Sequence, residues 1–457
     1  MNLNEIQNDD FRLLCEQVVG AMERYHVPGV AVGIIHDGAE HVAGFGVTNV
    51  DHRLPVDADT LFQIGSTTKT FTATLAMRLV EMGKFDLDAP IRKYLPDFRL
   101  QDEDVAARVT LRHLFSHTGG WMGDYFDDLG DGDDALARYI AKMVELPQLT
   151  PLGAVWSYNN AGFGVAGRVI EVVTGKTYEA ALKELVLDPL GLTMSFIFPK
   201  DVMTYRFAVG HNVVDDKPIV ARPWPIARTG NCVGGIAATA KDQLRYARFH
   251  MGDGAAADGT RLLTRESIAL MQTPQASAAL GEMIGISWFI KDAGDVRIVR
   301  HGGATNGQMS AFMFVPERGF AITVLTNANR GGELHREITT WALEHYLGVK
   351  EPAHTYIAMT DAQLAAYAGR YTTALADTEL KIGNGELVMY DTPKGGFPAK
   401  GSPPGPTPPP SRLAFIGTDR VLALDGHMKD MQGEFLCHPD GRIAWFRFGG
   451  RIRARAD

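Results

Sequence analysis

Strand-like segments lie near both ends of the first 350 residues, and helical segments fill the part between them. Two early segments are short, rich in Val, Ile or Gly, and separated by the turn signal Asp37-Gly38. They are Gly29–His36 and His41–Val47, and the late segments are Gly285–Ile290, Val296–Arg300, Ser310–Val315 and Ala321–Thr326. Two groups of strands so far apart predict a mixed α+β fold, with one antiparallel sheet assembled from distant parts of the chain.

The helical segments carry apolar residues at intervals of three and four. In the segment that begins at Ser66, the residues Phe71, Leu75, Leu79 and Met82 form one apolar stripe, and Gly83 marks its end. Further helices are predicted at Asp10–Arg24, Leu111–Ser116, Ala135–Val144, Ala161–Thr174, Tyr178–Leu187 and Ala240–His250. We therefore expect helices against the sheet and an all-helical region beside it.

The pattern changes near residue 350, which predicts a second, smaller domain. Residues 351–360 read as a linker between a first domain of residues 1–350 and a second of residues 361–457. Short strands are predicted at Gly369–Thr373, Glu379–Ile382, Glu386–Tyr390, Arg412–Ile416, Arg420–Leu424, Gly433–Cys437 and Arg442–Phe448. Seven such strands favour a small β-barrel or sandwich, interrupted by a long surface loop at Pro393–Pro410.

The composition is that of a globular protein and excludes several classes of function. Of 457 residues, 45% are hydrophobic and 22% are charged, which is enough apolar material for a large core. The net charge of -9, without a basic stripe, argues against a nucleic-acid partner. There is no apolar run of the roughly 20 residues that span a bilayer, and the amino terminus lacks a signal peptide, so we expect a cytoplasmic protein. Cys15, Cys232 and Cys437 are expected to be buried, reduced thiols.

Ser66-Thr67-Thr68-Lys69 opens the long helix and is the central motif. A spacing of three places Ser66 and Lys69 on one helix face. A serine hydroxyl becomes a good nucleophile when a neighbouring base removes its proton, and a lysine in an apolar pocket loses its charge more easily. Taken alone, the same spacing also fits an N-cap serine followed by a solvated lysine.

Two further segments carry candidate functional groups. Tyr158-Asn159-Asn160 precedes a helix, and the Tyr158 phenolate would be a base if nearby cations lowered its pKa. Asn160 can both donate and accept hydrogen bonds. His301-Gly302-Gly303-Ala304 follows a strand, and glycines there let backbone approach a ligand closely. The N–H of Ala304 is a candidate oxyanion donor opposite that of Ser66.

These three motifs in this order resemble the serine β-lactamase and penicillin-binding-protein superfamily, and most closely its class C-like branch of esterases, D-aminopeptidases and related hydrolases. Residues 83–91, 111–120 and 234–240 support the resemblance, which spans about residues 15–345. The tail from about residue 361 resembles the lipocalin-like domain of some members.

The resemblance implies a role for each motif residue. Ser66 would form an acyl-enzyme, Lys69 and Tyr158 would share the proton transfers, and Asn160 would orient Lys69 and the substrate amide. The N–H groups of Ser66 and Ala304, beside Gly303, would form the oxyanion hole. His301 stands where β-lactamases usually carry a lysine that holds the β-lactam carboxylate. Histidine is mostly neutral at pH 7, which favours an esterase or peptidase over a dedicated β-lactamase.

Several alternatives remain open at this stage. Within the acyl-transfer class they are an esterase, a D-aminopeptidase or D,D-peptidase, a weak β-lactamase, and a peptide-cyclising thioesterase. A catalytically silent binding scaffold is the alternative from another class. We expect a small ester, amide or peptide substrate, no cofactor and a possible homo-oligomer. No metal is expected, because the His113 and His117 pair lacks the glutamate of zinc proteases, and the aspartate-rich stretch 124–134 reads as a solvated loop.

Overall fold

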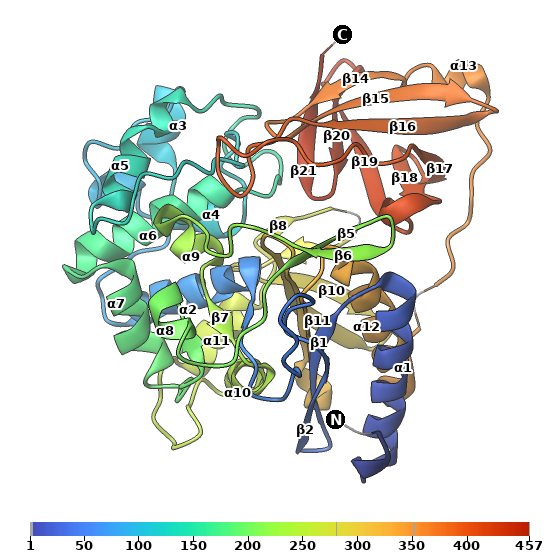
Figure 1. Ribbon diagram of the computed structural model, residues 1–457. Coiled ribbons are helices and arrows are strands. Elements are labelled where there is room, and N and C mark those ends of the chain that lie inside the picture. The colour runs from blue at the N-terminus through green and yellow to red at the C-terminus, as the bar shows by residue number, and fades with distance from the viewer. Residues whose placement is uncertain (1–2, 280, 351, 457) are drawn as a thin grey trace.

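The computed structural model describes residues 3–279, 281–350 and 352–456. Figure 1 shows a central sheet, a group of helices on one side of it, and a β-barrel above both. Of the expected domains and linker, residues 1, 2, 351 and 457 lie outside the described residues, as does residue 280.

The central sheet has eight strands, all paired antiparallel, in the order β2-β1-β13-β12-β11-β10-β9-β8. The strands are β1 Gly29–His36, β2 Ala39–Gly46, β8 Ala276–Ser277, β9 Met283–Ile284, β10 Phe289–Ala293, β11 Val296–Ala304, β12 Met309–Val315 and β13 Phe320–Thr326. The early strand β1 pairs directly with the late strand β13, which confirms the predicted sheet of distant segments.

One predicted strand is wrong in its first half. Residues 285–288 form a tight turn in which the Gly285 N–H donates to the Trp288 carbonyl at 2.7 Å, and Ser287 takes a φ of 70°. Strand β10 therefore begins only at Phe289. The apolar run over 285–290 reflects burial of Ile286 and Trp288 in the core rather than a strand.

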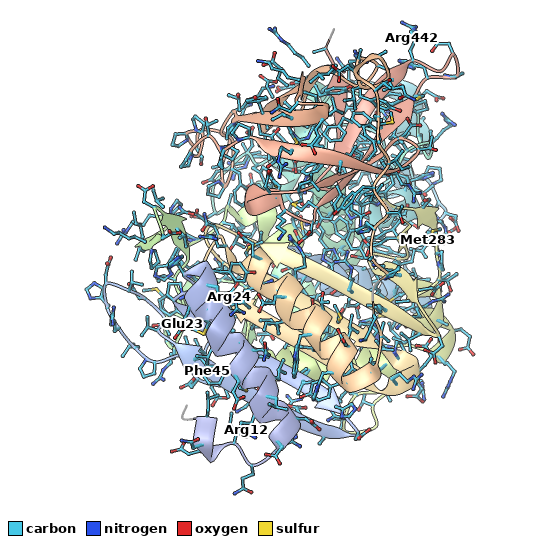
Figure 2. The ribbon with its side chains drawn as sticks, turned by 90° about the vertical axis from the view of Figure 1, so that its right-hand side faces the viewer. Arg12, Glu23, Arg24, Phe45, Met283 and Arg442 are labelled. Carbon is cyan, nitrogen blue, oxygen red and sulfur yellow. The ribbon has the colours of Figure 1, made fainter. Side chains whose placement is uncertain are left out.

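Helices cover both faces of the sheet. On one face, α1 Asp9–Tyr25 and α12 Gly331–Leu347 lie side by side, and Arg24 of α1 pairs with Glu337 of α12 (Figure 2). On the other face, α10 Ala240–Met251 contacts β1, β12 and β13. Helix α12 was not predicted, although Leu334, Ile338 and Ala342 are buried at helical spacing.

The remaining helices form the region beside the sheet, around α2 Thr68–Glu81. They are α3 Glu103–Arg108, α4 Leu111–Phe115, α5 Ala135–Ala141, α6 Asn160–Thr174, α7 Tyr178–Leu182, α8 Pro199–Val202, α9 Asn231–Gly234 and α11 Arg265–Met271. A π-helical turn at Lys183–Leu187 ends the predicted Tyr178–Leu187 helix. Short strands β3 Phe62–Gln63, β4 Ser195–Phe196 and β7 Ala237–Ala238 form a small sheet, and β5 His211–Val214 pairs with β6 Lys217–Val220.

The carboxy-terminal part is a closed barrel of eight strands, preceded by the short helix α13 Asp361–Leu364. Its strands are β14 Gly369–Thr372, β15 Ala376–Gly383, β16 Glu386–Pro393, β17 Ser411–Gly417, β18 Arg420–Ala423, β19 Gln432–Cys437, β20 Ile443–Phe448 and β21 Arg451–Arg455. Aromatic side chains fill the interior, among them Tyr371, Phe435 and Phe446. The loop between β16 and β17 has no regular strand or helix, as predicted.

Strand β21 was not predicted although Arg451–Arg455 alternates polar and apolar residues, because three of its five residues are arginines, which are mostly exposed in folded proteins. Arg453 points into the buried part of the barrel, where its Nη1 lies 2.6 Å from Asp391 Oδ1. A buried arginine is retained in such a place because a carboxylate compensates its charge. This strand closes the barrel by pairing with β14 and β20.

The cysteines and the helix lengths bear on two further expectations. Cys15 and Cys232 are buried free thiols as expected, but Cys437 is exposed at the end of β19, so the expectation of burial is wrong for that residue. Among the helices of the described residues, none has the length and apolarity required to cross a membrane.

Candidate active site

Ser66 lies in a single 3-10 turn, Gly65–Thr67, that leads directly into α2. Lys69 is on the first turn of α2 and is completely buried, with its Nζ 2.9 Å from Ser66 Oγ and 2.9 Å from the carbonyl oxygen of Val233. Burial lowers the pKa of Lys69 well below its usual value, and the positive charge of Arg451 lowers it further. Lys69 is thus close to Ser66 and is readily deprotonated.

Tyr158 comes two residues before α6 and faces the same pair. Its ring centre lies 5.0 Å from Lys69 Nζ, and its hydroxyl is buried without a hydrogen-bond partner of regular geometry among the described residues. Burial raises the pKa of the phenol, while the nearby Ser66 hydroxyl and the Arg451 guanidinium act in the opposite direction. Because burial dominates, Tyr158 rests in its protonated form and is not the phenolate that the sequence analysis considered.

Asn160, the first residue of α6, lines the same cavity as Ser66. The expected hydrogen bond between Asn160 and Lys69 is not found among the described residues. Instead, Asn160 Nδ2 donates to Asp124 Oδ1 at 2.7 Å, and Lys69 uses the Val233 carbonyl. Asn160 therefore contacts an acidic residue whose own second partner lies in the barrel.

That partner is Arg451, the first residue of β21. Its Nε and Nη2 lie 3.1 and 3.2 Å from the two carboxylate oxygens of Asp124, and its guanidinium carbon lies 4.8 Å from the centre of the Tyr158 ring. The β20–β21 turn is held in place by backbone contacts, since the Tyr158 N–H donates to the Gly450 carbonyl at 2.9 Å. Arg447 also donates to the Trp156 carbonyl at 2.7 Å. The barrel thus supplies a cation to the site.

The carboxyl end of β11 forms the opposite side of the site. Gly303 and Ala304 lie directly against the Ser66 turn: a Cβ on Gly303 would lie 2.7 Å from the Ser66 nitrogen, and one on Gly65 would lie 2.6 Å from the Ala304 nitrogen. Only glycine permits this approach, and Gly65 also takes a φ of 51°. The backbone nitrogens of Ser66 and Ala304 therefore belong to two segments in close contact.

His301 also lines the cavity and is 2% exposed. Its Nδ1 lies 2.6 Å from the Gly302 carbonyl oxygen. Burial, with a contribution from Lys69, lowers the pKa of His301 to about 3, so the ring is neutral at physiological pH. The neutral histidine predicted from the sequence is present at this position.

The cavity in front of Ser66 has a volume of about 720 Å³ and is bounded by both parts of the chain. Its walls are mainly aromatic and apolar. They include Tyr125, Phe126, Tyr139, Trp156, Phe289 and Met309, and from the barrel Leu375, Phe397 and Met431. Phe397, in the proline-rich loop, packs edge-to-face on Phe126 with ring centres 5.2 Å apart. Such a site suits an apolar ligand with a few polar contacts.

Two residues of this site, Asp124 and Arg451, were not predicted from the sequence. Asp124 belongs to the stretch expected to be a solvated loop, and that expectation is wrong for Asp124 and Asp127, whose side chains are each 7% exposed. The later aspartates of the stretch are exposed, as expected. No local pattern marks Arg451, because its proximity to the site arises only from the packing of the barrel.

The paired histidines have structural contacts. His113 Nδ1 is 2.8 Å from the Thr110 hydroxyl, and His117 Nδ1 accepts a hydrogen bond from the Asn159 N–H at 2.9 Å. His117 also stacks on Tyr158 with ring centres 4.3 Å apart. Within the described ranges, no group of three or more His, Cys, Asp or Glu side chains is arranged to hold a metal ion.

Comparisons with known proteins agree with this fold. Penicillin-binding protein 4 of Amycolatopsis lactamdurans is 35% identical over 335 residues, which cover 72% of this chain and 88% of that protein. The crystal structure of SurE matches with a TM-score of 0.77 and 25% identity over 97% of this chain and 98% of its own, so it includes the barrel. D-alanine carboxypeptidase AmpC from Burkholderia cenocepacia matches with a TM-score of 0.61 and 25% identity over 72% of this chain and 99% of its own. The family model described as Beta-lactamase matches residues 16–347, and the chain belongs to this family of serine hydrolases and penicillin-binding proteins.

Proposed function

We propose that this protein is a serine hydrolase that forms an acyl-enzyme on Ser66 with a small ester or amide substrate. The observation that carries the proposal is the contact between Ser66 Oγ and Lys69 Nζ at 2.9 Å, with the pKa of Lys69 lowered by burial. A neutral amine at this distance is a base for the serine hydroxyl.

The geometry supports a sequence of balanced steps. Lys69 takes the Ser66 proton as Oγ bonds to the substrate carbonyl carbon, and the N–H groups of Ser66 and Ala304 stabilise the oxyanion. Collapse of this intermediate breaks the bond to the leaving group, which takes a proton from the Tyr158 phenol. Lys69 passes its proton on to Tyr158. Water then attacks the acyl carbon and gives a proton to Lys69, the bond between the acyl carbon and Ser66 Oγ breaks, and Oγ takes that proton back as the acid leaves.

The cavity walls narrow the substrate class. Because they are mainly aromatic, we expect the best substrates to carry an apolar acyl group. The similar structures add a preference, since SurE has been determined with D-Leu and the match from Burkholderia cenocepacia is a D-alanine carboxypeptidase. Esters and amides of D-amino acids are therefore the first substrates to test, for an esterase or D-amino-acid peptidase activity.

A second candidate function is transfer of a peptidyl group to an amine of the same peptide, which would make a cyclic product. The size of the cavity favours it, because about 720 Å³ between two parts of the chain accommodates several residues. The chemistry up to the acyl-enzyme is the same for both functions. Product analysis by mass spectrometry separates them, since cyclisation yields a product one water lighter than hydrolysis.

A panel of p-nitrophenyl esters, D-amino acid anilides and nitrocefin tests the proposal. We expect the apolar esters and D-amino acid derivatives to be turned over and nitrocefin to be a poor substrate. Ser66→Ala should abolish turnover with an unchanged circular dichroism spectrum, and Lys69→Ala and Tyr158→Phe should each lower the rate by about a hundredfold or more. Wild-type turnover in Ser66→Ala would overturn the proposal, and no turnover or fluorophosphonate labelling of the wild type would favour a binding scaffold.

A further inference from the structure

The hydrogen bonding of His301 determines which of its nitrogens carries the proton. A backbone carbonyl oxygen can only accept, so the contact of 2.6 Å between His301 Nδ1 and the Gly302 oxygen requires a proton on Nδ1. A neutral imidazole carries a single N–H. Nε2 is therefore unprotonated and can only accept a hydrogen bond. It is buried with no hydrogen-bond partner among the described residues.

An unpaired buried acceptor costs free energy, and a ligand that brings a donor to it recovers that cost. His301 lines the cavity next to Ser66, and its ring centre is 6.3 Å from that of Tyr158. A residue of the cavity wall thus carries an unpaired acceptor beside the reaction centre.

The two arginines of the described cavity lining are each already paired with a carboxylate. Arg300 binds Glu282 through three contacts between 2.6 and 2.9 Å, and Arg451 binds both oxygens of Asp124. Lys69 tends to the neutral form. A substrate carboxylate next to His301 would therefore face the lone pair of Nε2 and arginines that are already paired with carboxylates. It would lose its hydrogen bonds to water without gaining new ones.

We propose that His301 Nε2 accepts a hydrogen bond from the substrate, and that the site consequently selects substrates bearing a neutral donor, such as a carboxamide or hydroxyl, where related sites bind a carboxylate. This inference rests on the proposed acylation of Ser66 and names the substrate class for it. His301 is then a specificity-determining residue.

The tautomer can be tested without any activity. Two-bond ¹H–¹⁵N correlation spectra of the protein labelled at histidine, with His301→Gln to assign the signal, should show the proton of His301 on Nδ1 and an unprotonated Nε2. A proton on Nε2 would overturn the inference.

Selection can be tested with two boronic acids, which bind reversibly to a reactive serine. The matched pair is 3-carbamoylphenylboronic acid and 3-carboxyphenylboronic acid, with inhibition constants measured against fluorophosphonate labelling of Ser66. We expect the carbamoyl compound to bind the wild type at least about tenfold more tightly than the carboxy compound, because only the amide can donate.

Variants at His301 distinguish acceptor chemistry from shape. His301→Gln offers both a donor and an acceptor and should weaken the preference. His301→Leu removes the acceptor and should bring the two inhibition constants within about twofold. His301→Lys should reverse their order. Equal binding by the wild type, or an unchanged preference in His301→Leu, would contradict the inference. Failure of both boronic acids and of the fluorophosphonate to react would instead refute the proposed function, and the tautomer measurement would still test His301.

Discussion

The guanidinium of Arg451, from the last strand of the barrel, lies 4.8 Å from the centre of the ring of Tyr158, two residues before α6. Arg451 also pairs with Asp124, which accepts a hydrogen bond from Asn160. Residues more than 290 positions apart in the chain thus form one electrostatic unit beside Ser66. The barrel is therefore part of the active-site architecture, and its removal should affect chemistry as well as stability.

Arg451→Ala should shift the pH dependence of acylation. Arg451 lowers the pKa of both Lys69 and Tyr158, so its loss raises both. Lys69 must be neutral to accept the Ser66 proton, so the acidic limb of kcat/KM should move to higher pH. Arg451→Lys keeps a charge and should restore part of the shift. Arg442→Ala, at the exposed far end of the barrel (Figure 2), is the control and should leave the profile unchanged. An Arg451→Ala profile identical to that of the wild type would refute this coupling.

A methyl group in the β20–β21 turn should impair catalysis through Tyr158. Gly450 takes a φ of 78°, and a Cβ there would lie 3.3 Å from the Trp156 ring. Gly450→Ala should displace the turn that holds the Tyr158 backbone and lower kcat/KM by about tenfold or more. Gly441→Ala is the matched control, because Gly441 has a φ of 86° but open space around its Cβ. Both variants carry the same kind of backbone strain, and equal losses of activity would show that the turn has no special role.

The protein should lose stability as the pH falls from about 6.5 towards 3. His250, His301 and His335 are buried, and burial lowers the pKa of each to about 3, whereas in the unfolded chain each has a pKa near 6.5. Between these values the unfolded state binds protons that the folded state does not, so stability is full above pH 6.5 and falls below it. Each of these histidines lowers the free energy of unfolding by about 1.4 kcal/mol for each pH unit below 6.5, so the three together lower it by several kcal/mol at pH 5.

Urea denaturation at pH 7 and pH 5 measures this effect. His335→Gln keeps a polar partner for the Thr326 hydroxyl, which lies 3.1 Å from His335 Nε2. Because His335 is one of three such histidines, the variant should remove about a third of the loss of stability that they cause together. An identical pH dependence in His335→Gln and wild type would show that His335 does not contribute.

The sequence predicted those features that local patterns carry. Strand β1 matches residue for residue, and Ser66, Tyr158 and His301, whose roles the family resemblance implied, line one cavity. Features that depend on tertiary packing were missed. They are the Arg-rich strand β21, in which Arg453 is buried against Asp391, and Asp124, whose side chain is 7% exposed where it pairs with Arg451. The apolar residues of 285–288 indicated burial correctly but not conformation, since a core turn and a core strand have similar composition.

The central claim is that Lys69 activates Ser66 for acylation, and mapping the acylated residue tests it most directly. After reaction with a fluorophosphonate, intact mass and peptide sequencing should show one adduct, on Ser66, formed at least about a hundredfold more slowly in Lys69→Ala. An adduct on another residue, or an equal rate of labelling in Lys69→Ala, would contradict the account.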